Sequence, residues 1–92
     1  MNIITVKDLV DQQLKRSGYK YQIRESTSTT SVYFKIYASN TNLLFRIADH
    51  KTKKDIITLR IDHKTSQQSI QRFVQNRIDD VKKRNLKIIL GI

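Results

Sequence analysis

Cysteine, proline and tryptophan are absent from the chain, and glycine occurs only twice in 92 residues. Without cysteine, no disulfide can brace a small core and no thiolate can serve as a nucleophile or a zinc ligand, which suits a reducing cytoplasm. Two glycines are too few for a glycine-rich loop that cradles phosphate. These absences exclude disulfide-rich scaffolds and several classes of enzyme.

Acidic residues are also scarce: eight stand against eighteen lysines and arginines, so the formal net charge is +10. Such a charge predicts attraction to polyanions and a fast encounter that depends on salt. A competing interpretation is that the charge only keeps the protein soluble, or reflects the lysine-rich composition of an AT-rich genome. We expect an acidic partner.

Length and composition indicate one small basic domain over residues 1–92. The chain is 38% hydrophobic and 28% charged, which is too apolar for a disordered tail and too polar for a membrane span. The opening MNIITVKDLV lacks the pattern of a secretory signal. We therefore expect a cytoplasmic protein with no membrane partner, and its oligomeric state stays open.

Hydrophobic spacing predicts an α+β fold made of a helix, a four-stranded antiparallel β-meander, a long C-terminal helix and a short apolar tail or edge strand. Val6, Val10 and Leu14 recur at helical spacing before Gly18, which predicts a short first helix. Apolar and polar residues then alternate with the period of a strand. The four expected strands cover residues 19–24, 31–39, 43–47 and 57–61.

A second helix is predicted from the capping-box spacing of Thr65 and Gln68 and from the apolar stripe that follows. Phe73 lies at the centre of this stripe and is expected to anchor the core. The helix is expected to end at KKRN, residues 82–85. The apolar stretch LKIILGI, residues 86–92, is compatible with an edge strand or with a tail tucked into the core.

One motif occurs twice, as RIADHKT and, a few residues later, as RIDHKT. In the local interpretation, Asp49 and Asp62 accept hydrogen bonds from backbone amides just past the strand ends. A metal site would combine these carboxylates with His50 and His63. An antiparallel meander would place the two copies at opposite edges of the sheet, so we expect neither a metal ion nor a cofactor.

Catalytic patterns are missing as well. The chain has no serine elbow, no His-Glu-x-x-His motif and no close pair of acids in an evident pocket. We therefore predict no catalytic residue and no enzymatic activity.

The arginines of the doubled motif, Arg46 and Arg60, have the outward parity of their strands. If Ile47 and Leu59 pair on the core face of an antiparallel sheet, the two guanidiniums lie opposite one another, where a phosphate could bridge them. The same face interleaves further cations with tyrosines, and a neighbouring turn adds lysines. The predicted nucleic-acid-binding residues are Lys20, Arg24, Tyr33, Lys35, Tyr37, Arg46, Arg60, Lys51, Lys53 and Lys54.

Aromatic and basic groups on an open sheet face can stack bases and follow a phosphate backbone. Two other interpretations remain. Tyr33 and Tyr37 could simply cover Lys35 in a cross-strand cluster, or the first helix could cover this face and create a second core.

The stretch SVYFKIYASNTNLLFRIADHKT, residues 31–52, resembles a pattern in small hypothetical proteins of phages, prophages and plasmids of low-GC Gram-positive bacteria. The pattern is a Ser-x-Tyr strand, a turn, and a strand that ends Arg-Ile-small-Asp-His. Ala48 stands here where serine is expected. The resemblance implies a mobile-element context, in which small basic proteins are often DNA-binding accessory factors or inhibitors of host nucleoprotein enzymes, anti-CRISPR proteins among them.

Taken together, charge, sheet face and resemblance predict a small non-catalytic accessory protein that binds nucleic acid. DNA is the first expectation and RNA the second, and the sequence does not distinguish them. The alternative belongs to another class: an inhibitor or adaptor that binds a host nucleic-acid-handling protein.

Overall fold

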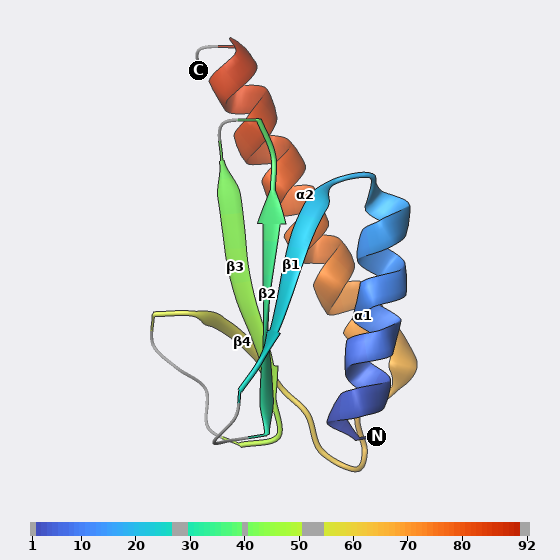
Figure 1. Ribbon diagram of the computed structural model, residues 1–92. Coiled ribbons are helices and arrows are strands. Elements are labelled where there is room, and N and C mark those ends of the chain that lie inside the picture. The colour runs from blue at the N-terminus through green and yellow to red at the C-terminus, as the bar shows by residue number, and fades with distance from the viewer. Residues whose placement is uncertain (1, 27–29, 40, 51–54, 91–92) are drawn as a thin grey trace.

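The computed structural model of the chain describes residues 2–26, 30–39, 41–50 and 55–90. Its elements are, in chain order, α1 (Ile3–Ser17), β1 (Lys20–Glu25), β2 (Ser31–Tyr37), β3 (Asn42–Ala48), β4 (Ile57–Arg60) and α2 (Gln67–Leu90). The four strands form one sheet in the order β1-β2-β3-β4, and α1 and α2 share a single core with one face of it (Figure 1). The predicted α+β class is confirmed.

Strand direction is where the predicted meander is wrong. β1 with β2 and β2 with β3 are antiparallel, but β4 runs parallel to β3, so the sheet is mixed. Ile47 does pair with Leu59. An alternating pattern determines which side chains share a face and carries no information on direction. Parallel strands usually need a connection of a dozen or more residues, and residues 49–56 are fewer than that. The length of this connection is therefore typical of an antiparallel hairpin.

α1 begins and ends at residues with clear capping roles. The side chain of Asn2 accepts a hydrogen bond of 2.9 Å from the backbone N–H of Thr5, which satisfies one of the free donors of the first turn. Gly18 ends the helix, as predicted, with a left-handed φ of 81° that favours glycine. Between these caps, Val6, Val10 and Leu14 are fully buried in the core that the helix shares with the sheet and α2.

The N-terminal cap of α2 lies one residue later than predicted, and the helix ends later than predicted. Ser66 Oγ, rather than Thr65, accepts from the backbone N–H of Ser69 at 3.1 Å. The helix continues through residues 86–90, so the predicted tail or edge strand is wrong. The sequence offers neither glycine nor proline inside α2, and its lysines, leucine and arginine favour helix. Within the described residues, no helix has both the length and the apolar character to cross a membrane.

The core is centred on two phenylalanines of the sheet. The rings of Phe34 and Phe45 stack with centroids 5.0 Å apart, and both side chains are fully buried. Phe73 meets Phe45 edge-on at 5.8 Å but is only partly buried, so it lies at the rim of the core and not at its centre. The buried stripe of α2 is formed by Ile70, Val74, Ile78 and Val81.

Candidate functional site

The face of the sheet opposite the helices, called here the outer face, carries most of the predicted binding residues. Cross-strand pairing arranges it in rows: Lys20 with Tyr37 and Asn42; Gln22 with Lys35 and Leu44; Arg24 with Tyr33, Arg46 and Thr58; Ser31 with Ala48 and Arg60. None of these paired residues is acidic. Because α1 packs on the other face, the alternative of a second core beneath α1 is wrong.

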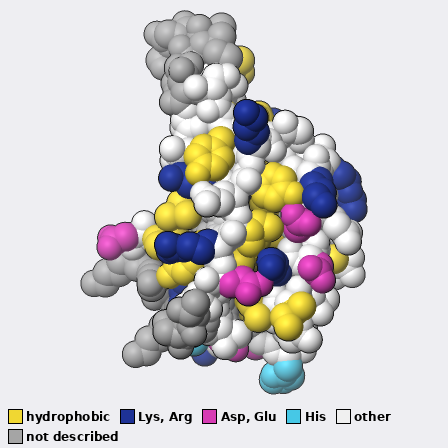
Figure 2. Space-filling view, in the orientation of Figure 1, with side chains coloured by type: hydrophobic (Ala, Val, Ile, Leu, Met, Phe, Trp, Pro, Cys, Tyr) yellow, Lys and Arg dark blue, Asp and Glu magenta, His cyan; other side chains and the backbone are white. Residues whose placement is uncertain are grey.

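Tyrosines and cations on the outer face are in direct contact. Tyr33 lies between two arginines of the flanking strands, with its ring centroid 5.1 Å from the guanidinium carbon of Arg24 and 5.9 Å from that of Arg46. Lys35 Nζ lies 5.5 Å from the ring of Tyr37. Figure 2 shows dark blue side chains among yellow ones over the strands, whereas magenta side chains gather mainly between β1 and α1. The rings thus hold positive charges in place on this face.

Arg46 departs from its predicted role. Its parity is outward, yet it is only 1% exposed. Its Nη2 lies 2.8 Å from Nε2 of His50, whose Nδ1 lies 3.1 Å from Asp49 Oδ1. A guanidinium can only donate, so His50 accepts at Nε2 and carries its proton on Nδ1, which donates to Asp49. Arg46 therefore ties the sheet to the segment after β3 instead of facing a partner.

The prediction that Arg46 and Arg60 face one another is also wrong. Because β3 and β4 are parallel, Arg46 lies beside Thr58, and Arg60 lies beside Ala48. Arg60 is exposed, but its strand, β4, is at the far edge of the sheet from β1. A phosphate bridged between the two guanidiniums is not part of this site.

The remaining predicted residues divide into two groups. Lys20, Arg24 and Lys35 are on neighbouring strands together with Tyr33 and Tyr37, so the structure brings these five together. Lys51, Lys53 and Lys54 lie outside the described residues.

A recess of about 310 Å³ opens on the outer face, and four of its lining residues are not among the predicted site residues. These are Gln22, Phe34, Leu44 and Ile56, which join Arg24, Tyr33 and Lys35. The sequence contains one signal for this recess. Leu44 is apolar although it has an outward position on its strand, between Asn42 and Arg46. Ile56 precedes β4, where strand parity gives no guidance.

The two copies of the doubled motif have different surroundings. Asp62 Oδ1 accepts hydrogen bonds from the backbone N–H of Lys64 at 2.8 Å and from Thr65 Oγ1 at 3.3 Å. The Lys64 bond is the main reason that the pKa of Asp62 lies below its usual value. The local interpretation is therefore confirmed for Asp62, whereas Asp49 contacts His50.

The geometric argument against a metal site was wrong, because the ends of two parallel strands lie at the same edge of the sheet. The described residues nevertheless contain no group of three or more histidines and acids that could hold a metal ion.

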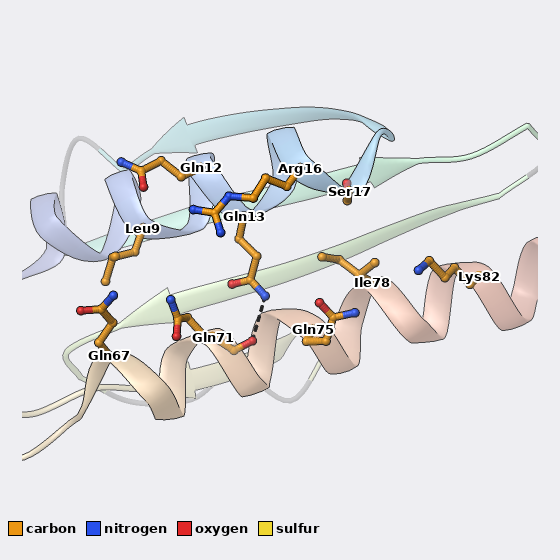
Figure 3. Close-up of a pocket in the computed structure, with 10 residues that line it drawn as sticks. All are labelled: Leu9, Gln12, Gln13, Arg16, Ser17, Gln67, Gln71, Gln75, Ile78 and Lys82. Atoms are coloured by element: carbon orange, nitrogen blue, oxygen red, sulfur yellow. Dashed lines mark hydrogen bonds between the residues drawn. The ribbon is translucent and has the colours of Figure 1, made fainter.

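A second groove, of about 460 Å³, separates α1 from α2 (Figure 3). Glutamine amides dominate its lining, and Gln13 Nε2 donates to the backbone oxygen of Gln71 at 2.9 Å. Arg16 and Lys82 are its cations, and neither an acid nor a histidine lines it. The hydrogen bond of Gln13 to Gln71 links the two helices through a neutral amide.

In comparisons with known proteins, no family model matches the chain, and neither a curated protein nor a solved structure does. Function therefore has to follow from the geometry of the outer face.

Proposed function

We propose that the protein binds nucleic acid through the outer face of its sheet, without catalysis. One observation carries the proposal: Lys20, Arg24 and Lys35 are interleaved with Tyr33 and Tyr37, and the paired rows of this face contain no acid. Phosphates would bind the cations, and the release of counterions would supply much of the affinity.

The contacts between rings and cations support this function in a second way. Arg24 is exposed, yet its guanidinium is held over Tyr33 at 5.1 Å. Part of the side-chain freedom that a free arginine would lose on binding is therefore already lost. A planar guanidinium held in this way suits phosphate, which it can contact with two parallel hydrogen bonds.

The net charge of +10 favours the same class of partner at long range. The proposal gives DNA precedence over RNA. It also includes a cytoplasmic location, since a chain without cysteine has no need of an oxidising compartment.

Fluorescence anisotropy with labelled DNA and RNA, each single-stranded and duplex, tests the proposal. We expect binding at about 50 mM salt and a linear fall of log affinity with log salt up to about 200 mM. No binding to any of the four ligands at low salt, by a protein with a cooperative melt, would contradict the proposed function.

A further inference from the structure

Leu44 is the unexplained side chain of the outer face. It is 40% exposed in the middle of β3, between rows that carry tyrosines and cations. Its partner in the row is Lys35. Because Phe45 pairs with Ile57 in a parallel register, the preceding residues, Leu44 of β3 and Ile56 just before β4, lie at the same level. The two aliphatic side chains therefore form an apolar wall beside a basic surface.

This wall belongs to the recess of about 310 Å³, which lies at the lower end of the volumes usual for small-molecule sites. Across from the wall, Arg24 and Lys35 supply positive charge, and Tyr33 supplies an aromatic ring. The lining contains no acid. An apolar wall with cations at its rim matches a flat, partly apolar group that is attached to an anion.

Gln22 adds a directed polar group. Tyr37 donates its hydroxyl proton to Gln22 Oε1 at 3.1 Å, which orients the carboxamide. The amide nitrogen of Gln22 then provides N–H donors on the other side of the group. Such donors match the carbonyl and ring-nitrogen acceptors on the edge of a nucleobase.

We propose that this recess takes one unpaired nucleobase, with the flanking phosphates on Arg24 and Lys35, so that the protein prefers single-stranded nucleic acid to duplex. In a duplex the bases are paired and stacked, and none can enter a recess without being flipped out at a cost of a few kcal/mol. A single strand offers its bases freely. The inference rests on the proposed function and adds the class of ligand.

Two exposed leucines provide a matched pair of variants. Leu44 is 40% exposed in the recess, and Leu86 is 56% exposed on α2. We compare Leu44→Ala and Leu86→Ala with the parent protein, using anisotropy on a single strand of about 15 nucleotides and on the corresponding duplex. DNA and RNA versions of each ligand separate the two sources of unpaired bases. Gln22→Ala is a second recess variant, at an exposed position where folding is not at risk.

The parent protein should bind the single strand more tightly than the duplex. Leu44→Ala should weaken single-strand binding about fivefold, because it removes apolar contact with the base, and should leave duplex binding unchanged. The slope of log affinity against log salt should stay the same, since no phosphate contact is lost. Gln22→Ala should behave in the same way, and Leu86→Ala should match the parent.

Equal affinity for single strand and duplex, or no effect of either recess variant on single-strand binding, would overturn the inference and leave the proposed function standing. A recess variant that loses affinity equally for single strand and duplex would also overturn the inference without contradicting the proposed function. If the parent protein binds none of the ligands, the proposed function fails together with the inference.

Discussion

Arg46 Nη2 lies 2.8 Å from Nε2 of His50, four residues further along the chain. The contact joins the outer face of β3 to the segment that follows it. Arg46 is only 1% exposed, and its guanidinium carbon lies 5.9 Å from the centroid of the Tyr33 ring. Its side chain is therefore part of the packing of this face, which gives the two arginines of the doubled motif different roles.

The first prediction compares these two arginines. Arg46→Ala should lower the free energy of unfolding by about 2 to 4 kcal/mol, because it removes a buried side chain and its hydrogen bond to His50. Arg60→Ala, at an exposed position, should change it by no more than about 0.5 kcal/mol. Urea melts of both variants measure the difference. Equal melts would show that Arg46 does not hold the face together.

The second prediction concerns the centre of the core. Phe45 is fully buried and contacts both Phe34 and Phe73, so Phe45→Ala should cost about 3 to 5 kcal/mol of stability. Phe73 is only partly buried, and Phe73→Ala should cost less, about 1 to 3 kcal/mol. The midpoints of denaturant unfolding, compared at equal m-values, show which of the two variants loses more stability. A larger loss for Phe73→Ala would place the centre of the core at α2.

The third prediction is a dependence of stability on high pH. Tyr21 donates its hydroxyl proton to Asp11 Oδ1 at 2.6 Å, and this hydrogen bond raises the pKa of Tyr21 from 10.0 to about 12. The folded protein thus holds this proton more tightly than the unfolded chain does. The stabilisation is complete below pH 10 and is lost as the pH rises from 10 to 12.

An ultraviolet titration of the folded protein should show an ionisation step of Tyr21 near pH 12. The matched control, Tyr21→Phe, should lack this step, and its stability should decline less over the same range. If the ionisation that is lost in Tyr21→Phe lies near pH 10 instead of pH 12, the bond to Asp11 does not hold the proton.

Several features of the fold could be predicted from sequence because they depend on local spacing. The apolar repeat of α1 and the alternation of β2 determine which side chains are buried, and Gly18 marks a helix end through its backbone freedom. The pairing of Ile47 with Leu59 could also be predicted from the sequence, since both residues belong to the core face.

The direction of β4 could not be predicted, because the alternation of apolar and polar residues is the same whichever way a strand runs. The end of α2 was missed for a related reason: a basic cluster suits the end of a helix but does not stop one, and neither glycine nor proline occurs within Gln67–Leu90.

Strand parity predicted part of the candidate site. Parity correctly placed Arg24, Tyr33 and Lys35 on one face. It could not show that Arg46 is buried, because that burial depends on packing against Tyr33 and on the hydrogen bond to His50. Nor could it show the recess, which needs side chains from β1, β2 and β3 together with Ile56.

In the proposed function, phosphates bind the cations of the outer face in preference to basic residues elsewhere on the protein. Two triple variants separate these possibilities, since each removes three positive charges. One replaces Lys20, Arg24 and Lys35 of the outer face by alanine, and the other replaces the exposed Lys82, Lys83 and Arg84 of α2. The measurement is the slope of log affinity against log salt for single-stranded DNA.

The outer-face variant should flatten this slope by about two units and weaken binding strongly, because each lost phosphate contact removes about 0.7 of a released counterion. The α2 variant should keep a slope close to that of the parent protein. If both variants flatten the slope equally, or if the α2 variant flattens it more, the outer face is not the binding surface.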